Sequence, residues 1–258
     1  MNTTGLHKHL AIFRCALAFY TRLPVGSAPL PTTLDGTCFW LPAIGIITGL
    51  LAAIVMVLCS FFFPWQVCGL AGCFAWTFVT GGLHLDGLAD CADGLLLEAS
   101  PEKRLSVMKD SRLGTFGGTA LFFALAAKFT ALAVLAERCA PSDLSAFLPL
   151  AGMCCLAGCL ARSAVLPAMF LTSARPGGLG EAVKVGLTKK KLAWSLLPAL
   201  LLCLVNGFCG LLALLLAAAV SCLFLRAAKK RLGGVTGDVF GCLIELVECT
   251  VLIGCCAL

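Results

Sequence analysis

The run Phe39–Phe63, FWLPAIGIITGLLAAIVMVLCSFFF, carries no charged side chain from end to end. An α-helix needs about 20 apolar residues to cross the hydrocarbon core of a bilayer, so this run is long enough to span a membrane with some tilt. Five further apolar runs follow it, at Gln66–Leu85, Gly117–Ala136, Phe147–Leu171, Leu192–Leu225 and Val239–Leu258. The sequence therefore predicts an all-α, polytopic integral membrane protein.

The composition indicates the same fold class. Of the 258 residues, 60% are hydrophobic and 12% are charged, and the mean hydropathy is +1.01. Soluble domains carry roughly 25% charged residues, so this chain cannot cover a globule with polar surface. We therefore expect membrane lipid as a partner and no nucleic acid. The 17 cysteines are scattered through the apolar runs without metal-type spacing, and we expect them to be free thiols.

The apolar runs predict about seven transmembrane helices. Leu192–Leu225 is too long for one span, and Asn206-Gly207 offers a tight turn between two short ones. Near the N-terminus, Leu10–Tyr20 is too short to span and contains Arg14, so we expect a short helix at the membrane interface. We treat residues 1–258 as a single membrane-embedded domain, and the sequence leaves a homo-oligomer open.

The Lys and Arg residues predict the orientation, because cytoplasmic loops carry an excess of them. With the N-terminus inside, seven spans place four segments on the cytoplasmic side: 1–38, 86–116, 172–191 and 226–238. These segments hold all of the 19 Lys and Arg residues except Lys128, Arg138 and Arg162. The polar loops should therefore face the cytoplasm.

The stretch Gly81–Leu96, GGLHLDGLADCADGLL, carries three carboxylates in a chain with few charges. On a helix, Asp90 and Asp93 fall roughly 40° and 20° either side of Asp86, so all three share one stripe. Three like charges on one stripe repel one another. A divalent cation would stabilise them, and the stripe therefore predicts a metal site. His84 projects away from the stripe, and we expect it to pack or to hydrogen-bond rather than to bind metal.

A second acidic stripe enters the membrane from the same side in the last span. Asp238 and Glu245 share a helix face, and Glu248 lies about 80° round from Asp238. Carboxylates inside a span are costly and indicate a functional site by default. Lys128 and Arg162 also lie within spans and have two interpretations. They contribute to a functional site, or they pair with Glu245 and Glu248 to cancel charge in lipid.

Two acidic stripes beside glycine-rich loops are typical of phosphoryl or phosphodiester transfer. Carboxylates hold Mg²⁺, which neutralises phosphate oxygens. Glycines let backbone amides approach the phosphates, and Arg supplies a bidentate fork. The loops on the predicted cytoplasmic side are KDSRLGTFGG (109–118), RPGGLGE (Arg175–Glu181) and GGVTGD (Gly233–Asp238).

Four longer motifs are spread along the chain between Phe19 and Glu248: FYTRLPV at Phe19–Val25, GGLHLDGLADCADGL at Gly81–Leu95, MKDSRLGTFGG at Met108–Gly118, and GGVTGDVFGCLIELVE at Gly233–Glu248. In sequence and in order they resemble the cobalamin 5′-phosphate synthase family, also called adenosylcobinamide-GDP ribazoletransferases. The loop Arg175–Gly180 matches that family only loosely.

The resemblance implies an inner-membrane transferase that completes the nucleotide loop of cobalamin. It would join adenosylcobinamide-GDP to α-ribazole, or to its 5′-phosphate, and release GMP, with Mg²⁺ as cofactor. Asp86, Asp90 and Asp93 would be catalytic, and they would bind the metal together with Asp238 and Glu245. Substrate contacts would come from six polar or charged side chains: Arg22, Lys109, Ser111, Arg112, Arg162 and Glu248.

The alternative function is a cation-coupled transporter, in which intramembrane carboxylates carry protons or metal ions. Acids at mid-depth in several spans would favour transport, whereas acids collected at one face favour an enzyme. The sequence favours the enzyme, because four carboxylates lie near the predicted cytoplasmic ends of their spans: Asp86, Asp90, Asp93 and Asp238.

Overall fold

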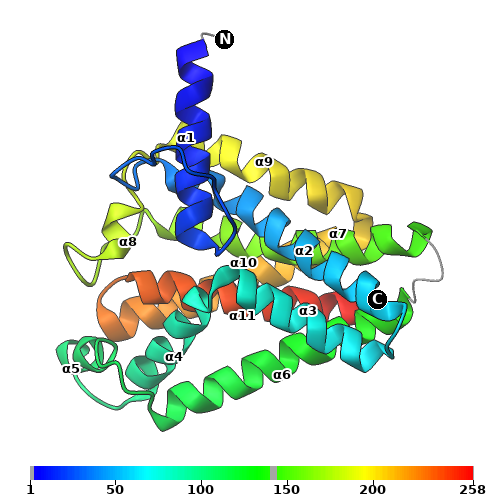
Figure 1. Cartoon of the computed structure of the whole chain (residues 1–258). Helices are drawn as coiled ribbons and strands as arrows, with labels where there is room; N and C mark the ends of the chain where they lie inside the picture. The colour runs from blue at the N-terminus through cyan, green and yellow to red at the C-terminus, as the bar shows by residue number, and fades with distance from the viewer. Residues whose placement is uncertain (1–2, 140–143, 258) are drawn as a thin grey trace.

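The computed structural model describes residues 3–139 and 144–257, and its regular elements are helices (Figure 1). In chain order they are α1 (Thr3–Tyr20), η1 (Thr37–Trp40), α2 (Leu41–Ser60), α3 (Trp65–Thr80), α4 (Leu83–Leu96), α5 (Pro101–Val107), α6 (Thr115–Arg138), α7 (Leu144–Ala168), α8 (Leu179–Ala182), α9 (Lys189–Val205), α10 (Gly207–Leu232) and α11 (Gly237–Cys256). The predicted all-α fold of a polytopic membrane protein is confirmed.

The number of spanning helices is lower than predicted. Among the described residues, five helices are long and apolar enough to cross a membrane, namely α2 with η1, α6, α7, α10 and α11. A sixth span results if α3 and α4 count as one helix broken by a 90° bend. The predicted turn at Asn206-Gly207 does separate α9 from α10, but α9 has 17 residues and starts with three lysines, which leaves it a short apolar length.

Glycines let α2 and α7 pack backbone to backbone at the centre of the bundle. A Cβ atom on Gly45 would collide with the carbonyl oxygen of Gly158, and one on Gly49 would collide with that of Cys154. Gly45 and Gly49 are four residues apart and therefore lie on one face of α2. Such close approach drives helix association in membranes, where lipid already solvates apolar side chains.

The corner between α3 and α4 directs the acidic stretch across the end of the bundle. It is formed by Gly81 and Gly82, whose backbone φ angles are 63° and 73°. Glycine adopts this left-handed conformation without the steric cost that a Cβ atom imposes. Arg22 holds the corner from outside: its backbone N–H donates to the Val79 carbonyl at 2.7 Å, and its side chain lies against Gly81.

Four connecting segments meet at one end of the bundle, at the left of Figure 1: residues 21–40, 97–114, 169–188 and 233–236. Hydrogen bonds join them, from Val235 N to Thr172 O at 2.9 Å, from Gly36 N to Val185 O at 3.0 Å, and from Arg175 Nη2 to Leu105 O at 3.2 Å. The segments predicted to share one side of the membrane therefore do lie together. That this side is the cytoplasm stays a prediction.

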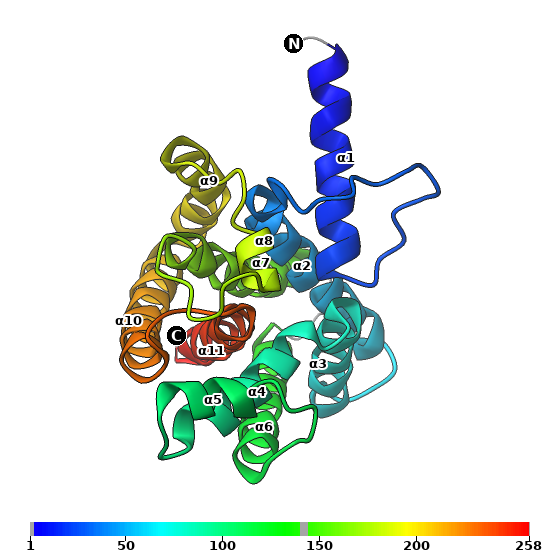
Figure 2. The ribbon, with the colours of Figure 1, turned by 90° about the vertical axis from the view of Figure 1, so that its left-hand side faces the viewer.

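Helix α1 is longer than the predicted Leu10–Tyr20 and begins at Thr3. It runs across the direction of the bundle and extends beyond it (Figures 1 and 2). Its location at a membrane interface stays a prediction. The 17 cysteines are free thiols, as expected.

Candidate active site

The acidic stripe of α4 faces the start of α11, because two glycines let these helices cross in contact. A Cβ atom on Gly87 would lie 3.2 Å from the Cα atom of Gly241 and 2.8 Å from the carbonyl oxygen of Asp238. Asp86 and Asp90 flank Gly87 on α4, and Asp238 lies in the first turn of α11. The crossing therefore brings the two predicted acidic stripes together at their ends.

The three carboxylates at this crossing carry excess negative charge. Asp90 lies within electrostatic range of Asp86 and Asp238, and Asp86 also acts on Asp238. Asp238 Oδ2 accepts hydrogen bonds from Arg175 Nη1 and from the Thr236 hydroxyl, each at 3.3 Å. Within residues 3–139 and 144–257, neither Asp86 nor Asp90 forms an ion pair. A bound cation would relieve this repulsion.

Asp93 turns away from the other two aspartates of α4 and caps helix α6. Its carboxylate oxygens accept hydrogen bonds from the backbone N–H groups of Gly114 and Gly117, each at 2.8 Å. Gly114 occupies the N-cap position of α6 and has no side chain with which to cap it. A carboxylate at this place satisfies free N–H groups and lies at the positive end of the helix dipole. The predicted cluster of three aspartates is thereby divided: Asp86 and Asp90 face α11, and Asp93 faces α6.

The remaining carboxylates fit a magnesium ion that is bound together with substrate. The part of the chain that the structure describes contains no group of three or more His, Cys, Asp or Glu side chains arranged to hold a metal. Mg²⁺ does not require such a cage, because proteins commonly hold it through one or two carboxylates plus substrate phosphates and water. Asp86, Asp90 and Asp238 supply hard oxygen ligands of this kind, and the first two form no ion pair with any described residue.

Arg175 is the residue of this site that the sequence analysis missed. Its guanidinium donates to Asp238 and also to the Leu105 carbonyl at 3.2 Å. It lines a polar cavity of about 260 Å³ together with Ser173, Thr236, Asp238 and the glycines of two loops. The available signal was a single Arg in front of a glycine-rich loop on the predicted cytoplasmic side. The loose match of that loop to the family motif gave it too little weight.

A second cavity, of about 190 Å³, meets the polar cavity at Asp238. The two share four lining residues: Leu179, Gly180, Gly237 and Asp238. Gly180 lets the α8 segment approach α11 this closely, since a Cβ atom on it would lie 2.7 Å from the backbone nitrogen of Gly237. Asp86 also lines the second cavity. Two carboxylates therefore stand where a polar and a mainly apolar cavity adjoin.

The basic loop between α5 and α6 lies at the surface beside Asp93. Lys109, Ser111 and Arg112 are exposed and line neither cavity. Arg112 Nη2 pairs with Asp110 Oδ2 at 2.6 Å, and the hydrogen bonds from Arg112 lower the pKa of the Asp110 carboxyl to about 2. Arg22 is likewise exposed, at the α3–α4 corner, and lines neither cavity. Phosphate contact by these four residues stays a prediction.

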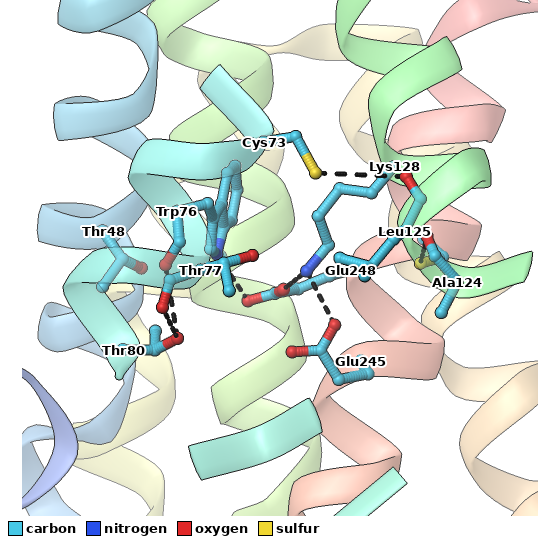
Figure 3. A network of polar contacts seen from close by, with 12 residues as sticks. Thr48, Cys73, Trp76, Thr77, Thr80, Ala124, Leu125, Lys128, Glu245 and Glu248 are labelled. Atoms are coloured by element: carbon cyan, nitrogen blue, oxygen red, sulfur yellow. Dashed lines mark hydrogen bonds and ion pairs between the residues drawn. The ribbon is translucent and has the colours of Figure 1, made fainter. Parts of the chain in front are cut away.

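Glu245 and Glu248 take part in a buried ion-pair network inside the bundle (Figure 3). Lys128 Nζ donates to Glu245 Oε2 at 2.7 Å and to Glu248 Oε2 at 2.6 Å. Arg162 Nη1 donates to Glu248 Oε1 at 2.6 Å, and Trp76 Nε1 donates to the same oxygen at 3.0 Å. Two positive and two negative side chains therefore neutralise one another away from water.

This network corrects three of the predicted roles. Glu245 pairs with Lys128 and not with the aspartates, so its geometry does not support metal binding. Arg162 and Glu248 are both 0% exposed and bind each other, so neither presents its charge to a substrate. The physical reason is the cost of a lone charge in an apolar interior, which a paired opposite charge offsets. Lys128 and Arg162 thus follow the structural interpretation given above.

Residues 12–256 match the family model described as cobalamin-5-phosphate synthase. The chain belongs to this family. It is similar to the adenosylcobinamide-GDP ribazoletransferase of Stutzerimonas stutzeri strain A1501, with 38% identity over 93% of this chain and 95% of the relative. The protein of the same name from Pseudomonas aeruginosa strain PAO1 is 37% identical over 92% of this chain and 94% of its own. No solved structure matches the chain.

The motifs that resembled the cobalamin-5-phosphate synthase family all lie within the matched region. Three of them meet at one end of the bundle: the first braces the α3–α4 corner, the second supplies Asp86 and Asp90, and the fourth supplies Asp238. The third motif starts α6, where Asp93 caps it. Membership of the cobalamin-5-phosphate synthase family, predicted from these motifs, is therefore confirmed.

Proposed function

We propose that this protein is an adenosylcobinamide-GDP ribazoletransferase, which catalyses the last step of nucleotide-loop assembly in cobalamin biosynthesis. Its substrates are adenosylcobinamide-GDP and α-ribazole, or the 5′-phosphate of α-ribazole. A ribose hydroxyl forms a new bond to the cobinamide-side phosphorus, and the bond from that phosphorus to the bridging oxygen breaks. GMP leaves with the bridging oxygen, and the hydroxyl proton passes to a carboxylate. Family membership and the names of the relatives support this activity.

The observation that carries the proposal is the position of Asp86, Asp90 and Asp238 next to Arg175. A pyrophosphate is an anion whose oxygens need both hydrogen-bond donors and neutralising charge. The Arg175 guanidinium offers a forked donor for phosphate oxygens at one wall of the polar cavity. The three carboxylates would hold Mg²⁺, which, when bound, supplies neutralising charge on the pyrophosphate and on the departing phosphate.

Each residue of the site then has a task of its own. Arg175 would bind and orient the pyrophosphate, and its existing bond to Asp238 keeps the guanidinium in the wall of the polar cavity. A carboxylate of the cluster would accept the hydroxyl proton. Asp93 would act indirectly, since it fixes the start of α6 against the C-terminal half of α4.

The protein crosses the membrane several times, and we place it in the inner membrane with the active site facing the cytoplasm. The end of the bundle that holds the site also holds the loops with nearly all Lys and Arg residues, which favours the cytoplasmic side. Lipid would surround the bundle, since α10 exposes large apolar side chains along its length, among them Leu211, Leu215 and Leu223.

No observation favours the transporter alternative. The acids at depth, Glu245 and Glu248, are held by Lys128 and Arg162 in a network with no net charge. Asp86 and Asp90, which form no ion pair with any described residue, lie on α4 at one end of the bundle (Figure 1). A transport pathway would instead place unpaired acids along the depth of the spans.

The test is an assay of the purified protein in detergent with adenosylcobinamide-GDP, α-ribazole and Mg²⁺, in which GMP is separated and quantified. We expect GMP and a cobalamin product in equal amounts. Asp86→Ala should abolish the release of GMP, while Asp35→Ala, a change in the exposed loop before η1, should leave it intact. Absence of GMP with the wild-type protein, or undiminished GMP with Asp86→Ala, would contradict the proposal.

A further inference from the structure

The cavity that adjoins the carboxylates is almost wholly apolar. It has a volume of about 190 Å³ and lies between the end of α1, the start of α2, α4, α7, the α8 segment and α11. Its walls are aliphatic and aromatic side chains, among them Phe19, Leu41, Val165, Val183, Phe240 and Ile244. A dry cavity of roughly 150 Å³ is enough to bind benzene, so this one accommodates a larger aromatic ring system that enters from its open edge.

Besides the carboxylates of Asp86 and Asp238, two polar side chains in the wall have no hydrogen-bond partner among the described residues, the Tyr20 hydroxyl and the His84 ring. His84 lines the cavity and is 3% exposed. Neither of its ring nitrogens has a hydrogen-bond partner among the described residues. Buried polar groups are normally hydrogen-bonded, and an exception asks for an explanation such as an absent ligand. His84 is therefore packed in the interior, as expected, but it lines the same cavity as Asp86.

We propose that this cavity binds the base of the acceptor nucleoside, with His84 as its hydrogen-bonding partner. The inference rests on the proposed function and names the place of one of its two substrates. α-Ribazole carries a dimethylbenzimidazole, an uncharged fused ring with two methyl groups and one free ring nitrogen. That base needs apolar walls and a polar partner for its ring nitrogen, and the cavity provides both beside the carboxylates of Asp86 and Asp238.

Guanine, the base of the departing nucleotide, fits the cavity poorly. Guanine presents several donors and acceptors around its edge, and most of them would stay unpaired against aliphatic walls. The position of the cavity agrees with the assignment. A base beside His84 would place its ribose near Asp86 and Asp238, which line the same cavity. The attacking hydroxyl would then stand at the carboxylates, with the pyrophosphate beyond it in the cavity of Arg175.

Two variants of the cavity and one matched control test the assignment. Ile244→Phe fills the cavity from α11, and His84→Phe keeps a ring but removes the hydrogen-bonding nitrogens. Ile253→Phe makes the first change on an exposed side of the same helix, far from the cavity. Initial rates of GMP release are measured while each substrate is varied with the other held at saturation, for protein that elutes as a single species in detergent.

We expect both cavity variants to raise the KM for α-ribazole at least tenfold and to leave the KM for adenosylcobinamide-GDP within twofold. Ile253→Phe should change neither. A riboside of benzimidazole without its two methyl groups should have a KM about tenfold higher than α-ribazole, because each buried methyl group contributes about 0.8 kcal/mol, or roughly fourfold. A raised KM for adenosylcobinamide-GDP alone, or no change in either KM, would overturn the assignment.

Equilibrium dialysis with α-ribazole alone separates this inference from the proposed function. Wild-type protein should bind α-ribazole, and both cavity variants should lose at least tenfold in affinity. If GMP is never released but this binding pattern appears, the cavity assignment stands and the proposed reaction does not. If GMP is released and the cavity variants bind α-ribazole as the wild type does, only the cavity assignment is contradicted.

Discussion

Gly87 of α4 and Gly241 of α11 bring their two helices into backbone contact, with the Cα atom of Gly241 only 3.2 Å from the place of a Cβ atom on Gly87. No side chain separates the helices at this point. The distance between Asp86 and Asp238 therefore depends on the absence of two methyl groups, and the catalytic geometry depends on helix packing rather than on a loop.

Gly87→Ala should consequently reduce activity more than it reduces stability. The added methyl group would meet the backbone of α11 at Asp238, and the helices would have to move apart. We expect the rate of GMP release to fall at least about tenfold, since small misplacements of reacting groups are costly. Gly118→Ala on α6 is the control, because its Cβ atom would lie 3.8 Å from Leu113 and has room. Equal activity of the two variants would argue against the crossing as a determinant of the site.

Substitution of Asp93 and substitution of Asp86 should have different effects on stability and on the release of GMP. Asp93→Ala leaves two N–H groups at the start of α6 without an acceptor, so the protein should lose about 1–2 kcal/mol of stability. Asp86→Ala removes a charge that repels Asp90 and Asp238, so the melting temperature should stay the same or rise, while GMP release is lost. Thermal unfolding in detergent and the GMP assay, run on both variants, measure the difference. A melting temperature that falls with Asp86→Ala and not with Asp93→Ala would reverse these roles.

The stability of the protein should depend on whether the charges of the buried ion-pair network balance. Lys128→Met leaves Glu245 and Glu248 with only Arg162 as a cation, and breaking a buried pair in this way costs about 3–5 kcal/mol. The double variant Lys128→Met/Glu245→Gln restores neutrality, because Arg162 and Glu248 remain as a pair. We therefore expect the double variant to melt at a higher temperature than Lys128→Met alone. Additive losses in the double variant would show that the network does not act as a charge-balanced unit.

The requirement for magnesium should distinguish the aspartates from Glu245. EDTA should abolish GMP release, and added Mg²⁺ should restore it. Asp86→Asn should raise the Mg²⁺ concentration that gives half-maximal activity by at least about tenfold, as the loss of a metal-site group does elsewhere. Glu245→Gln should leave that concentration unchanged in whatever protein remains folded, since Glu245 binds Lys128. A shift for Glu245→Gln equal to that for Asp86→Asn would restore Glu245 as a metal ligand.

Patterns along the chain were enough to predict the helical fold class, the family, and that the polar loops lie together at one end of the bundle. They were also enough to bring Asp86, Asp90 and Asp238 into one site, because charges that cost free energy in a membrane protein are few and their spacing is informative. Periodicity failed at Asp93: the helix face was predicted correctly, but a single face of α4 contacts both α11 and the start of α6. Helix packing decides which neighbouring helix a carboxylate contacts. A helical wheel carries no information about that packing.

Long-range partners account for the other differences. Glu245 shares a helix face with Asp238, yet two turns of helix carry it away from the loops and into contact with Lys128 of α6. Arg175 lies in a loop whose residues have no periodicity, so nothing local connects it to Asp238, 63 positions away. The cavity beside His84 is formed by segments from six helices, and no single stretch of sequence describes a cavity wall.

The position of α11 has a consequence for how the protein is made. Its residues leave the ribosome after those of α6 and α7, yet they supply Asp238 to the site and both acidic partners of Lys128 and Arg162. Until α11 inserts, α6 and α7 hold two unneutralised cations within the bilayer, so the incomplete chain is both inactive and poorly stabilised. We therefore expect membrane proteases to degrade a chain that is truncated before Gly237, so that it does not accumulate.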